Sequence, residues 1–235
     1  MRATDPTDVE RRSEDRPRAV VSWSSGKDSA YSLHLARRAG ELEIVGLLTT
    51  ITETFARVSM HGVRKELLER QADVAGLPLY PVSIPFPCPN AIYEERMGQM
   101  IARLREEGVS RIAFGDLYLE DIRSYREGKL RGTGIRPVFP LWGRATRDLA
   151  HEMIRSGMRA TIVAVDPRKL PGTFAGRSFD ETLLCELPAG VDPCGENGEF
   201  HTFVSDGPMF RGPVAVRPGA VVERDGFVFA DLEPG

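Results

Sequence analysis

The stretch SWSSGKDSAYSLHLA, from Ser22 to Ala36, sets small polar residues between an apolar run and an amphipathic one. The preceding residues, RAVVSW (Arg18–Trp23), predict a buried β-strand. The residues from Asp28 to Ala39 predict an α-helix that stops at Gly40. The polar cluster therefore falls where a strand turns into a helix. It either only turns the chain or holds a ligand there.

The same alternation of strand and helix continues along the chain. Further strands are expected at Glu43–Thr50, Leu79–Ile84, Ser110–Phe114 and Ala160–Val165, and further helices at Val63–Ala75, Ala91–Glu107 and Thr146–Ser156. Four of the helical patterns end at a glycine, which takes the left-handed backbone conformation without strain (Gly40, Gly76, Gly108, Gly157). Strands that are nearly all apolar are covered on both faces, so the pattern predicts an α/β fold with a parallel, Rossmann-like sheet flanked by helices.

The pattern changes after about Asp166. Residues 179–187 predict a short helix or turn, and short strands are expected at Phe200–Val204, Pro213–Val216, Ala220–Glu223 and Phe227–Ala230. Arg224 to Gly226 (RDG) is typical of a hairpin turn. We expect a mobile arm over residues 1–17, an α/β domain over 18–166 and a smaller β-containing portion over 167–235.

Composition excludes several classes of protein. The chain has 235 residues, a net charge of −3 and 41% hydrophobic residues, so nothing indicates a nucleic-acid-binding surface. No apolar run has the length of a membrane span, and the charged start does not resemble a secretory signal. The three cysteines (Cys88, Cys185, Cys194) lack CxxC spacing, which argues against zinc or iron–sulfur sites and favours reduced thiols in the cytoplasm.

The polar cluster has the ingredients of a phosphate site. A parallel sheet binds ligands at the carboxyl ends of its strands, and the helix after the cluster opens with unpaired N–H groups and a positive dipole end. Serine hydroxyls add donors and Lys27 adds a positive charge. A plain turn with Asp28 as the helix N-cap is the simpler alternative, but it does not explain the lysine. A Walker loop would need a glycine where Val21 stands and a hydroxyl where Asp28 stands. A serine-rich flavin-phosphate loop remains conceivable.

The motif SWSSGKDS resembles the SGGKDS signature of the PP-loop ATP pyrophosphatases, with Ser25 in place of the first glycine. Three more stretches resemble the diphthine–ammonia ligase group of that superfamily: FGDLYLEDIRSYRE (114–127), PVFPLWGRATRDLAHEMIRSGMRATIVAVD (137–166) and GENGEFHTFVSDGPMF (195–210). The resemblance implies a HUP-type sheet, as in adenine nucleotide α-hydrolases. It implies ATP as cofactor, cut to AMP and pyrophosphate, and a homodimer.

The expected ATP-binding residues follow from the loop and from two other turns. They are Ser24, Ser25, Gly26, Lys27, Ser29, Gly115 and Arg144. Asp116 follows the fourth strand, and a carboxylate beside a polyphosphate is stable only with a cation between them, so Asp116 is a candidate ligand of Mg²⁺. Its alternative role is an N-cap of the next helix. Lys27, Asp28 and Asp116 are the expected catalytic residues.

The expected acceptor residues come mainly from the resemblance. They are His61, Asp121, Tyr125, Glu196, Asn197 and Glu199. The turn GENGE (195–199) holds two acids and an amide between glycines, suited to an amine or ammonium group, although a plain hairpin is the alternative.

The function expected is that of an adenylating ligase. An acceptor carboxylate attacks the α-phosphorus of ATP, pyrophosphate leaves, and ammonia opens the acyl-adenylate to form an amide. The alternatives are a non-enzymatic sensor that binds ATP or AMP, and a PP-loop enzyme that acts on another acceptor such as a tRNA base. No membrane or nucleic-acid partner is expected.

Overall fold

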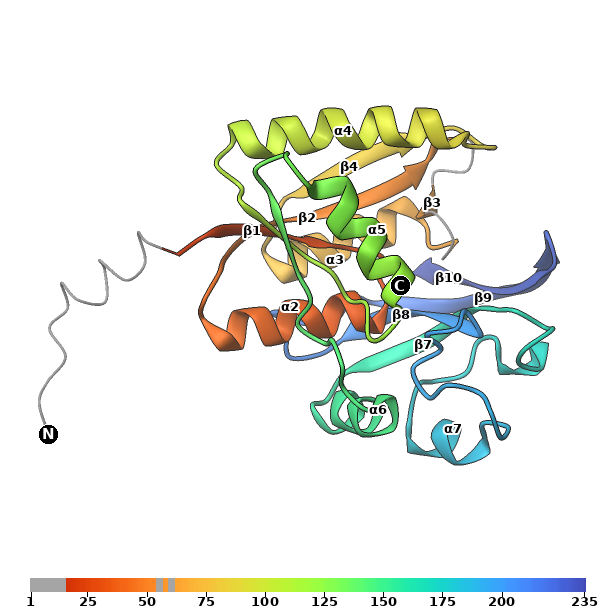
Figure 1. Ribbon diagram of the computed structural model, residues 1–235. Helices are drawn as coiled ribbons and strands as arrows, with labels where there is room; N and C mark the ends of the chain where they lie inside the picture. Colours follow the sequence, from red (N-terminus) through yellow and green to blue (C-terminus); the bar gives the residue numbers. More distant parts are fainter. Residues whose placement is uncertain (1–15, 54–56, 59–61) are drawn as a thin grey trace, which may run out of the picture.

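The computed structural model describes residues 16–53, 57–58 and 62–235. The chain forms two sheets stacked through a layer of helices (Figure 1). Nearly all of the predicted arm, and His61, lie outside the described residues. Within the described part of the chain, no helix is long and apolar enough to cross a membrane.

The first sheet contains five parallel strands in the order β4-β2-β1-β5-β6. They are β1 (Arg18–Ser22), β2 (Glu43–Thr52), β4 (Leu79–Ile84), β5 (Arg111–Ala113) and β6 (Arg136–Val138), and a two-residue strand, β3 (Arg57–Val58), pairs antiparallel with β2. The predicted parallel, Rossmann-like sheet is confirmed. The sequence did not predict β6, because it is only three residues long and contains Pro137.

Helices cover both faces of this sheet. On one face lie α2 (Lys27–Ala39) and α3 (Lys65–Ala75), and on the other lie α4 (Asn90–Glu106) and α5 (Glu120–Leu130) (Figure 1). Successive residues of β1 point to opposite faces, so Val21 joins the core under α2 and α3 while Val20 joins the core under α4. All four glycines predicted to end helices have positive φ angles.

The second sheet is antiparallel, in the order β8-β7-β10-β9. Its strands are β7 (Arg159–Val165), β8 (Phe200–Asp206), β9 (Val216–Arg224) and β10 (Phe227–Pro234). The predicted hairpin turn is confirmed, with Asp225 and Gly226 both at positive φ between β9 and β10.

Strand β7 departs from the expectation. The sequence predicts a strand at 160–165 as the last unit of the parallel domain, but β7 pairs antiparallel with β8 and β10 of the second sheet. Both faces of β7 are covered, so its residues are as apolar as those of a parallel strand and the pattern does not distinguish the two cases.

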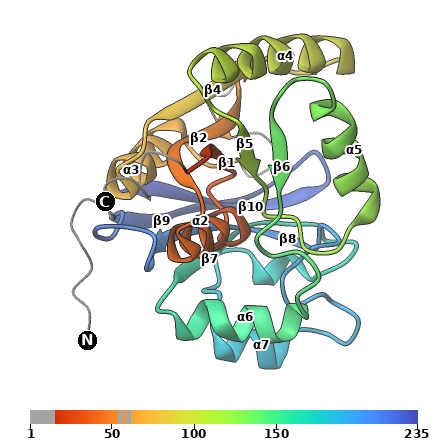
Figure 2. The ribbon, with the colours of Figure 1, turned by 60° about the vertical axis from the view of Figure 1, so that its left-hand side comes forward.

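The second sheet packs beneath the first. Strand β8 lies against α2 and β10 lies against α3, while α6 (Thr146–Arg155) and the short α7 (Glu181–Glu186) pack on the far side (Figure 2). A 3-10 helix at Gly172–Phe174 follows β7. The helices α2 and α3 are therefore enclosed between two sheets.

Gln71 of α3 joins the two sheets through hydrogen bonds. Its side chain is fully buried, accepts from Trp23 Nε1 (3.0 Å), and donates to the carbonyls of Ser25 (3.1 Å) and Val204 (2.6 Å). One amide thus satisfies groups from the end of β1, from the loop after it and from β8. An apolar side chain at this position would leave a buried indole N–H and carbonyl groups with fewer partners.

We predict that Gln71→Leu lowers the free energy of unfolding by about 2–4 kcal/mol, because buried polar groups lose their partner. Urea denaturation measures the change. The matched control is Gln99→Leu on the exposed side of α4, which should change stability by less than about 0.5 kcal/mol. Equal effects of the two substitutions would contradict the role assigned to Gln71.

Candidate functional site

The strand order fixes where a ligand can bind. Connections from β1 and β5 leave in opposite directions, so the loops after these strands border a crevice at the carboxyl edge of the sheet. The two loops touch. A Cβ atom on Gly115 would lie 2.9 Å from the carbonyl carbon of Asp28 and 3.0 Å from the nitrogen of Ser29. Only glycine allows the loop after β5 to approach the first turn of α2 so closely.

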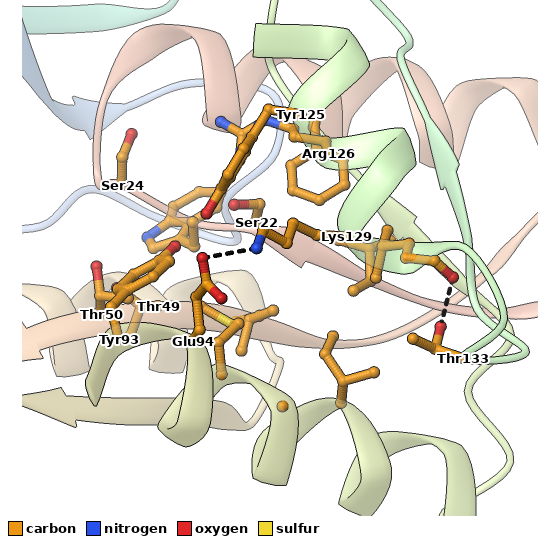
Figure 3. Close-up of a pocket in the computed structure, with 18 of the residues that line it drawn as sticks. Ser22, Ser24, Thr49, Thr50, Tyr93, Glu94, Tyr125, Arg126, Lys129 and Thr133 are labelled. Carbon is orange, nitrogen blue, oxygen red and sulfur yellow. Dashed lines mark hydrogen bonds and ion pairs between the residues drawn. The ribbon is translucent and has the colours of Figure 1, made fainter. Parts of the chain in front are cut away.

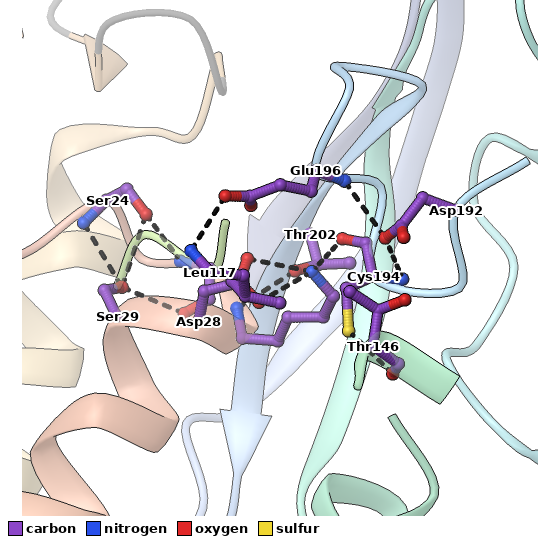
Figure 4. A network of polar contacts seen from close by, with 11 residues as sticks. Ser24, Asp28, Ser29, Leu117, Thr146, Asp192, Cys194, Glu196 and Thr202 are labelled. Atoms are coloured by element: carbon purple, nitrogen blue, oxygen red, sulfur yellow. Dashed lines mark hydrogen bonds and ion pairs between the residues drawn. The ribbon is translucent and has the colours of Figure 1, made fainter. Parts of the chain in front are cut away.

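The loop after β1 forms the amino end of α2. Gly26 is the N-cap and supplies no side-chain cap, and Asp28 lies within the first turn instead of at the cap. The first helical N–H, that of Lys27, donates to Thr202 Oγ1 at 3.0 Å. Ser24 Oγ lies 3.3 Å from Ser29 Oγ, and Ser29 Oγ donates to the carbonyl of Gly26 at 2.9 Å (Figure 4). The loop thus presents two serine hydroxyls beside a helix N-terminus, which is an arrangement suited to an anion.

Ser25 adopts a backbone conformation that favours glycine. Its φ angle is 72°, and its side chain is fully buried. Its carbonyl accepts from the amide nitrogen of Val204 at 3.0 Å, whereas its hydroxyl has no hydrogen-bond partner among the described residues. This is the position at which the related signature carries glycine. The serine therefore carries both backbone strain and an unsatisfied hydroxyl.

The ammonium of Lys27 is buried beneath the C-terminal half of the chain. It donates to both carboxylate oxygens of Asp28 (2.8 and 3.0 Å) and to the carbonyl of Cys194. The rings of Phe179 and Phe200 lie 5.7 and 5.5 Å away. Burial alone would lower the pKa of Lys27, but the charge and hydrogen bond of Asp28, together with the charges of Cys194 and Glu196, outweigh it and the pKa is raised. Lys27 is therefore charged and is oriented by the C-terminal segment.

Asp116 is held by a cation from α5. Arg126 donates to both of its oxygens, from Nε at 2.5 Å and from Nη2 at 3.0 Å, and the guanidinium stacks 4.4 Å from the ring of Phe114. Among the residues that the structure describes, no group of three or more His, Cys, Asp or Glu side chains is arranged to hold a metal ion. The carboxylates of Asp28 and Asp116 are both paired with cations, so they do not form a ready Mg²⁺ site.

The turn of residues 192–199 brings Glu196 against the loop after β5. Glu196 Oε1 accepts from the backbone nitrogen of Leu117 at 2.8 Å (Figure 4). Burial, together with the negative charges of Asp28 and Asp116, raises the pKa of Glu196 from 4.5 to about 7, although the Leu117 bond and Lys27 oppose the shift. A carboxyl group that titrates near neutral pH is suited to proton transfer.

The two other predicted residues of this turn face each other. Glu199 is buried, and its Oε1 accepts from the Asn197 amide at 3.2 Å and from the nitrogen of Asp192 at 3.1 Å. Asn197 also accepts from the hydroxyl of Tyr118 at 3.1 Å. The structure thus brings Glu196, Asn197 and Glu199 together in one turn beside the amino end of α2.

A pocket of about 510 Å³ opens beside this loop (Figure 3). Ser22 at the end of β1 lines it, together with Trp23 and Ser24 of the following loop. The other lining residues are Leu48, Thr49 and Thr50 of β2, Ile112 of β5, Phe114 just after β5, residues of α4 and α5, and His201. Of the predicted site residues, Ser24 and Tyr125 line it. The sequence did not single out its α4 wall, because Met97 and Ile101 follow the same spacing as an ordinary helix core.

His201 was also left without a role by the sequence. Burial and the charges of Lys27 and Lys169 lower the pKa of His201 to about 4, so its ring is neutral at physiological pH. It borders the pocket from the start of β8.

Arg144 and Asp121 are among the predicted residues that do not line the pocket. Arg144 donates from Nη1 to Glu152 Oε1 of α6 at 3.2 Å, and the same carboxylate accepts from the Tyr31 hydroxyl at 2.7 Å. Asp121 is exposed in the first turn of α5. Their expected roles toward ATP and the acceptor stay predictions.

A doubly wound parallel sheet with a serine–glycine–lysine loop at the reversal of strand order defines a PP-loop type of nucleotide-binding fold. Two family models match: the diphthamide synthase N-terminal domain over residues 17–137 and the diphthamide synthase C-terminal domain over residues 145–228. The chain belongs to the diphthamide synthase family. The expected resemblance is confirmed, and with it the expectation of an enzyme of the ligase class.

Curated relatives agree with the family. The chain is 29% identical to the diphthine--ammonia ligases of Bos taurus and of Homo sapiens, over 92% of this chain and 88% of each relative. It is 24% identical to that of Schizosaccharomyces pombe, over 85% of this chain and 36% of the relative. Among solved structures, the U34-tRNA thiolase NcsA from Methanococcus maripaludis matches at a TM-score of 0.37 and 15% identity, over 63% of each chain. At this score the likeness says nothing about activity.

We predict that Ser25→Gly raises the free energy of unfolding by about 1 kcal/mol. The substitution relieves the strain of a left-handed backbone conformation and removes an unpartnered buried hydroxyl. Together these two gains in folded-state stability exceed the entropy cost of glycine in the unfolded chain. Urea denaturation measures the effect. Ser24→Gly is the control, since Ser24 is not at positive φ and its hydroxyl has partners. If Ser25→Gly were as destabilising as the control, the strain would be absent.

The raised pKa of Glu196 predicts a pH-dependent effect of Glu196→Gln. Between pH 4.5 and 7 the folded protein holds a proton on Glu196 that the unfolded chain has lost, so this group's contribution to stability falls as the pH rises. Glutamine keeps an oxygen for the Leu117 nitrogen and cannot ionise. The free energy of unfolding of the variant minus that of the unmodified protein should therefore be larger at pH 8 than at pH 5. A stability difference independent of pH, measured by urea midpoints, would refute the shift.

Proposed function

We propose that this chain is an ATP-dependent amide ligase that cleaves ATP to AMP and pyrophosphate and joins ammonia to an acceptor carboxylate. The observation that carries the proposal is the loop of residues 24–29. It lies at the carboxyl edge of the parallel sheet and begins α2, whose N-cap residue is a glycine without a side chain. The name of the relatives, diphthine--ammonia ligase, supports an acceptor of the diphthine type.

The polyphosphate would lie against the amino end of α2. The hydroxyls of Ser24 and Ser29 would turn from each other and from the Gly26 carbonyl to donate to its oxygens, and the positive end of the helix dipole would offset its charge. Lys27 would act from beneath the loop, because its ammonium is bound by Asp28 and by the Cys194 carbonyl. The protein would then mainly position the reactants and stabilise the developing charge.

Two bond exchanges make up the proposed reaction. A carboxylate oxygen of the acceptor attacks the α-phosphorus, an O–P bond forms, and the bond to pyrophosphate breaks. The nitrogen of ammonia then attacks the acyl carbon, a C–N bond forms, the C–O bond breaks, and AMP leaves. One proton is released in the second step. Glu196 is the proposed proton acceptor, since its pKa of about 7 matches that task.

Mg²⁺, the homodimer, and the division of the chain at residue 166 stay proposals. Asp116 is the proposed Mg²⁺ ligand, but Arg126 occupies both of its oxygens, so no step above depends on the metal. The two family models meet between residues 137 and 145, before the predicted boundary.

The test is to quantify AMP and pyrophosphate formed from ATP, ammonium chloride and a panel of carboxylate acceptors, including a diphthine-bearing protein. We expect AMP and pyrophosphate in equal amounts, formed only with the right acceptor. The double variant Lys27→Met/Asp28→Asn removes a buried ion pair as a unit, which limits the loss of stability. It should slow pyrophosphate release by about 100-fold or more, since the ammonium no longer stabilises the transition state.

A thermal melt of the double variant confirms that it is folded. Near-normal pyrophosphate release by the folded variant would remove Lys27 from the mechanism. Binding of ATP without AMP formation, over the whole panel, would instead favour a nucleotide sensor. Retention of tRNA in a filter-binding assay at physiological salt would favour an RNA acceptor.

A further inference from the structure

The turn of residues 192–199 belongs to a long connection without regular structure. Residues 187–199, which join α7 to β8, form neither a helix nor a strand. Gly195 and Gly198 in this connection have positive φ angles, of 69° and 79°. Glycine loses more conformational freedom on folding than other residues do, so fixing such a segment costs entropy. Contacts with the rest of the molecule therefore have to hold the turn in its folded place.

Hydrogen bonds within the turn fix its shape. Asp192 Oδ1 accepts from the backbone nitrogen of Cys194 at 2.8 Å and from that of Glu196 at 3.3 Å (Figure 4). The nitrogen of Asp192 donates to Glu199 Oε1 at 3.1 Å. Because both partners of each bond belong to the turn, these bonds do not determine where the turn lies against its neighbours.

One side of the turn meets the N-terminal half of the chain through its side chains. Glu196 accepts from the Leu117 nitrogen, and Asn197 accepts from the Tyr118 hydroxyl. Two consecutive residues of the loop after β5 thus contact two consecutive residues of the turn. Both contacts use side chains that are assigned to the proposed reaction. They cannot anchor the turn while the same side chains engage a substrate.

The other side of the turn is held through its main chain by residues 166–169. The backbone nitrogen of Asp166 donates to the carbonyl of Glu199 at 3.0 Å, and Lys169 Nζ donates to the carbonyl of Asn197 at 2.5 Å. Gly198 lies between these two carbonyls, and a Cβ atom there would be 3.6 Å from Lys169 Nζ. The two contacts use no side chain of the turn, so they persist whatever its side chains bind.

Lys169 is itself placed by a buried residue. Asp166, directly after β7, is buried, and its carbonyl accepts from the Lys169 nitrogen at 3.0 Å. Both carboxylate oxygens of Asp166 accept from the Arg168 guanidinium at 2.8 Å, whereas Lys169 Nζ lies 3.9 Å from Oδ2. The ammonium of Lys169 is therefore directed at the Asn197 carbonyl. A hydrogen bond from a charged donor is stronger than one between neutral groups.

We propose that Lys169 is a positioning residue, which holds the turn of residues 192–199 by its main chain so that Glu196 stays against the loop after β5. This inference rests on the proposed function, in which Glu196 accepts a proton. Lys169 does not line the pocket. It acts on the reaction through Asn197, and not by contact with a substrate.

The first test measures amide hydrogen exchange of the full chain by mass spectrometry. Lys169→Met removes the ammonium, and Lys169→Arg keeps a charged donor for the same carbonyl. Lys65→Met is the matched control, because the Lys65 side chain is 49% exposed against 45% for Lys169 and is paired with Glu69 on α3. We expect Lys169→Met to speed exchange in residues 192–199 by about fivefold or more and to leave residues 24–29 unchanged. Lys169→Arg and Lys65→Met should exchange like the unmodified protein.

The second test measures turnover of the same variants with ATP, ammonium chloride and the acceptor that supports AMP formation. Lys169→Met should lower kcat by about tenfold or more, because a displaced Glu196 no longer reaches the reacting atoms. The KM for ATP should stay unchanged, since Lys169 makes no contact with the loop of residues 24–29 in the described structure. Lys169→Arg should restore most of the rate, and Lys65→Met should have the unmodified rate.

Unchanged exchange in Lys169→Met would overturn the inference even if turnover fell. The loss would then come from the charge of Lys169, which also lowers the pKa of His201 beside the pocket. Faster exchange without a loss of turnover would overturn it as well, as would a rise in the KM for ATP as large as the fall in kcat. If the unmodified protein formed no AMP with any acceptor, the proposed function would fail, while the exchange experiment would still decide whether Lys169 holds the turn.

Discussion

The buried ammonium of Lys27 is the constraint on which the arrangement of the site depends. A charge without water needs partners, and Lys27 finds them in Asp28 of its own helix, in the Cys194 carbonyl and in the faces of two phenylalanine rings. These partners come from both halves of the chain. The C-terminal segment must therefore close over the loop for the lysine to be satisfied, and that closure also brings Glu196 to the loop after β5.

The amino end of α2 is the point where the remaining parts of the molecule meet. Thr202 of β8 accepts from the Lys27 nitrogen at 3.0 Å, Gly115 approaches the first turn from β5, and Gln71 of α3 holds the Ser25 carbonyl. The two family models place the second sheet in a separate domain from the first sheet. The second sheet nevertheless completes the surroundings of the loop of residues 24–29, which belongs to the N-terminal domain. Neither half builds the site alone.

The parallel sheet and its phosphate loop were predictable because both depend on local patterns. Apolar runs, helical stripes and terminal glycines predict the alternation of strands and helices. The small polar residues after β1 indicate the edge of the sheet at which a ligand binds. The pairing of β7 was not predictable, since an apolar strand is equally suited to either sheet. The Asp116–Arg126 and Lys27–Cys194 contacts were missed because they join residues through the tertiary fold. The α4 wall of the pocket was missed because its spacing is that of a core helix.

The backbone bonds of Ser25 have a thermodynamic consequence for any ligand at the loop. Its carbonyl accepts from both β8 and Gln71, so the main chain is already immobilised before an anion arrives. An ordered receptor loses little conformational entropy on association, and more of each contact's free energy then appears as affinity. The rigidity that forces a serine into a glycine conformation is thus the same rigidity that makes the loop a preorganised receptor.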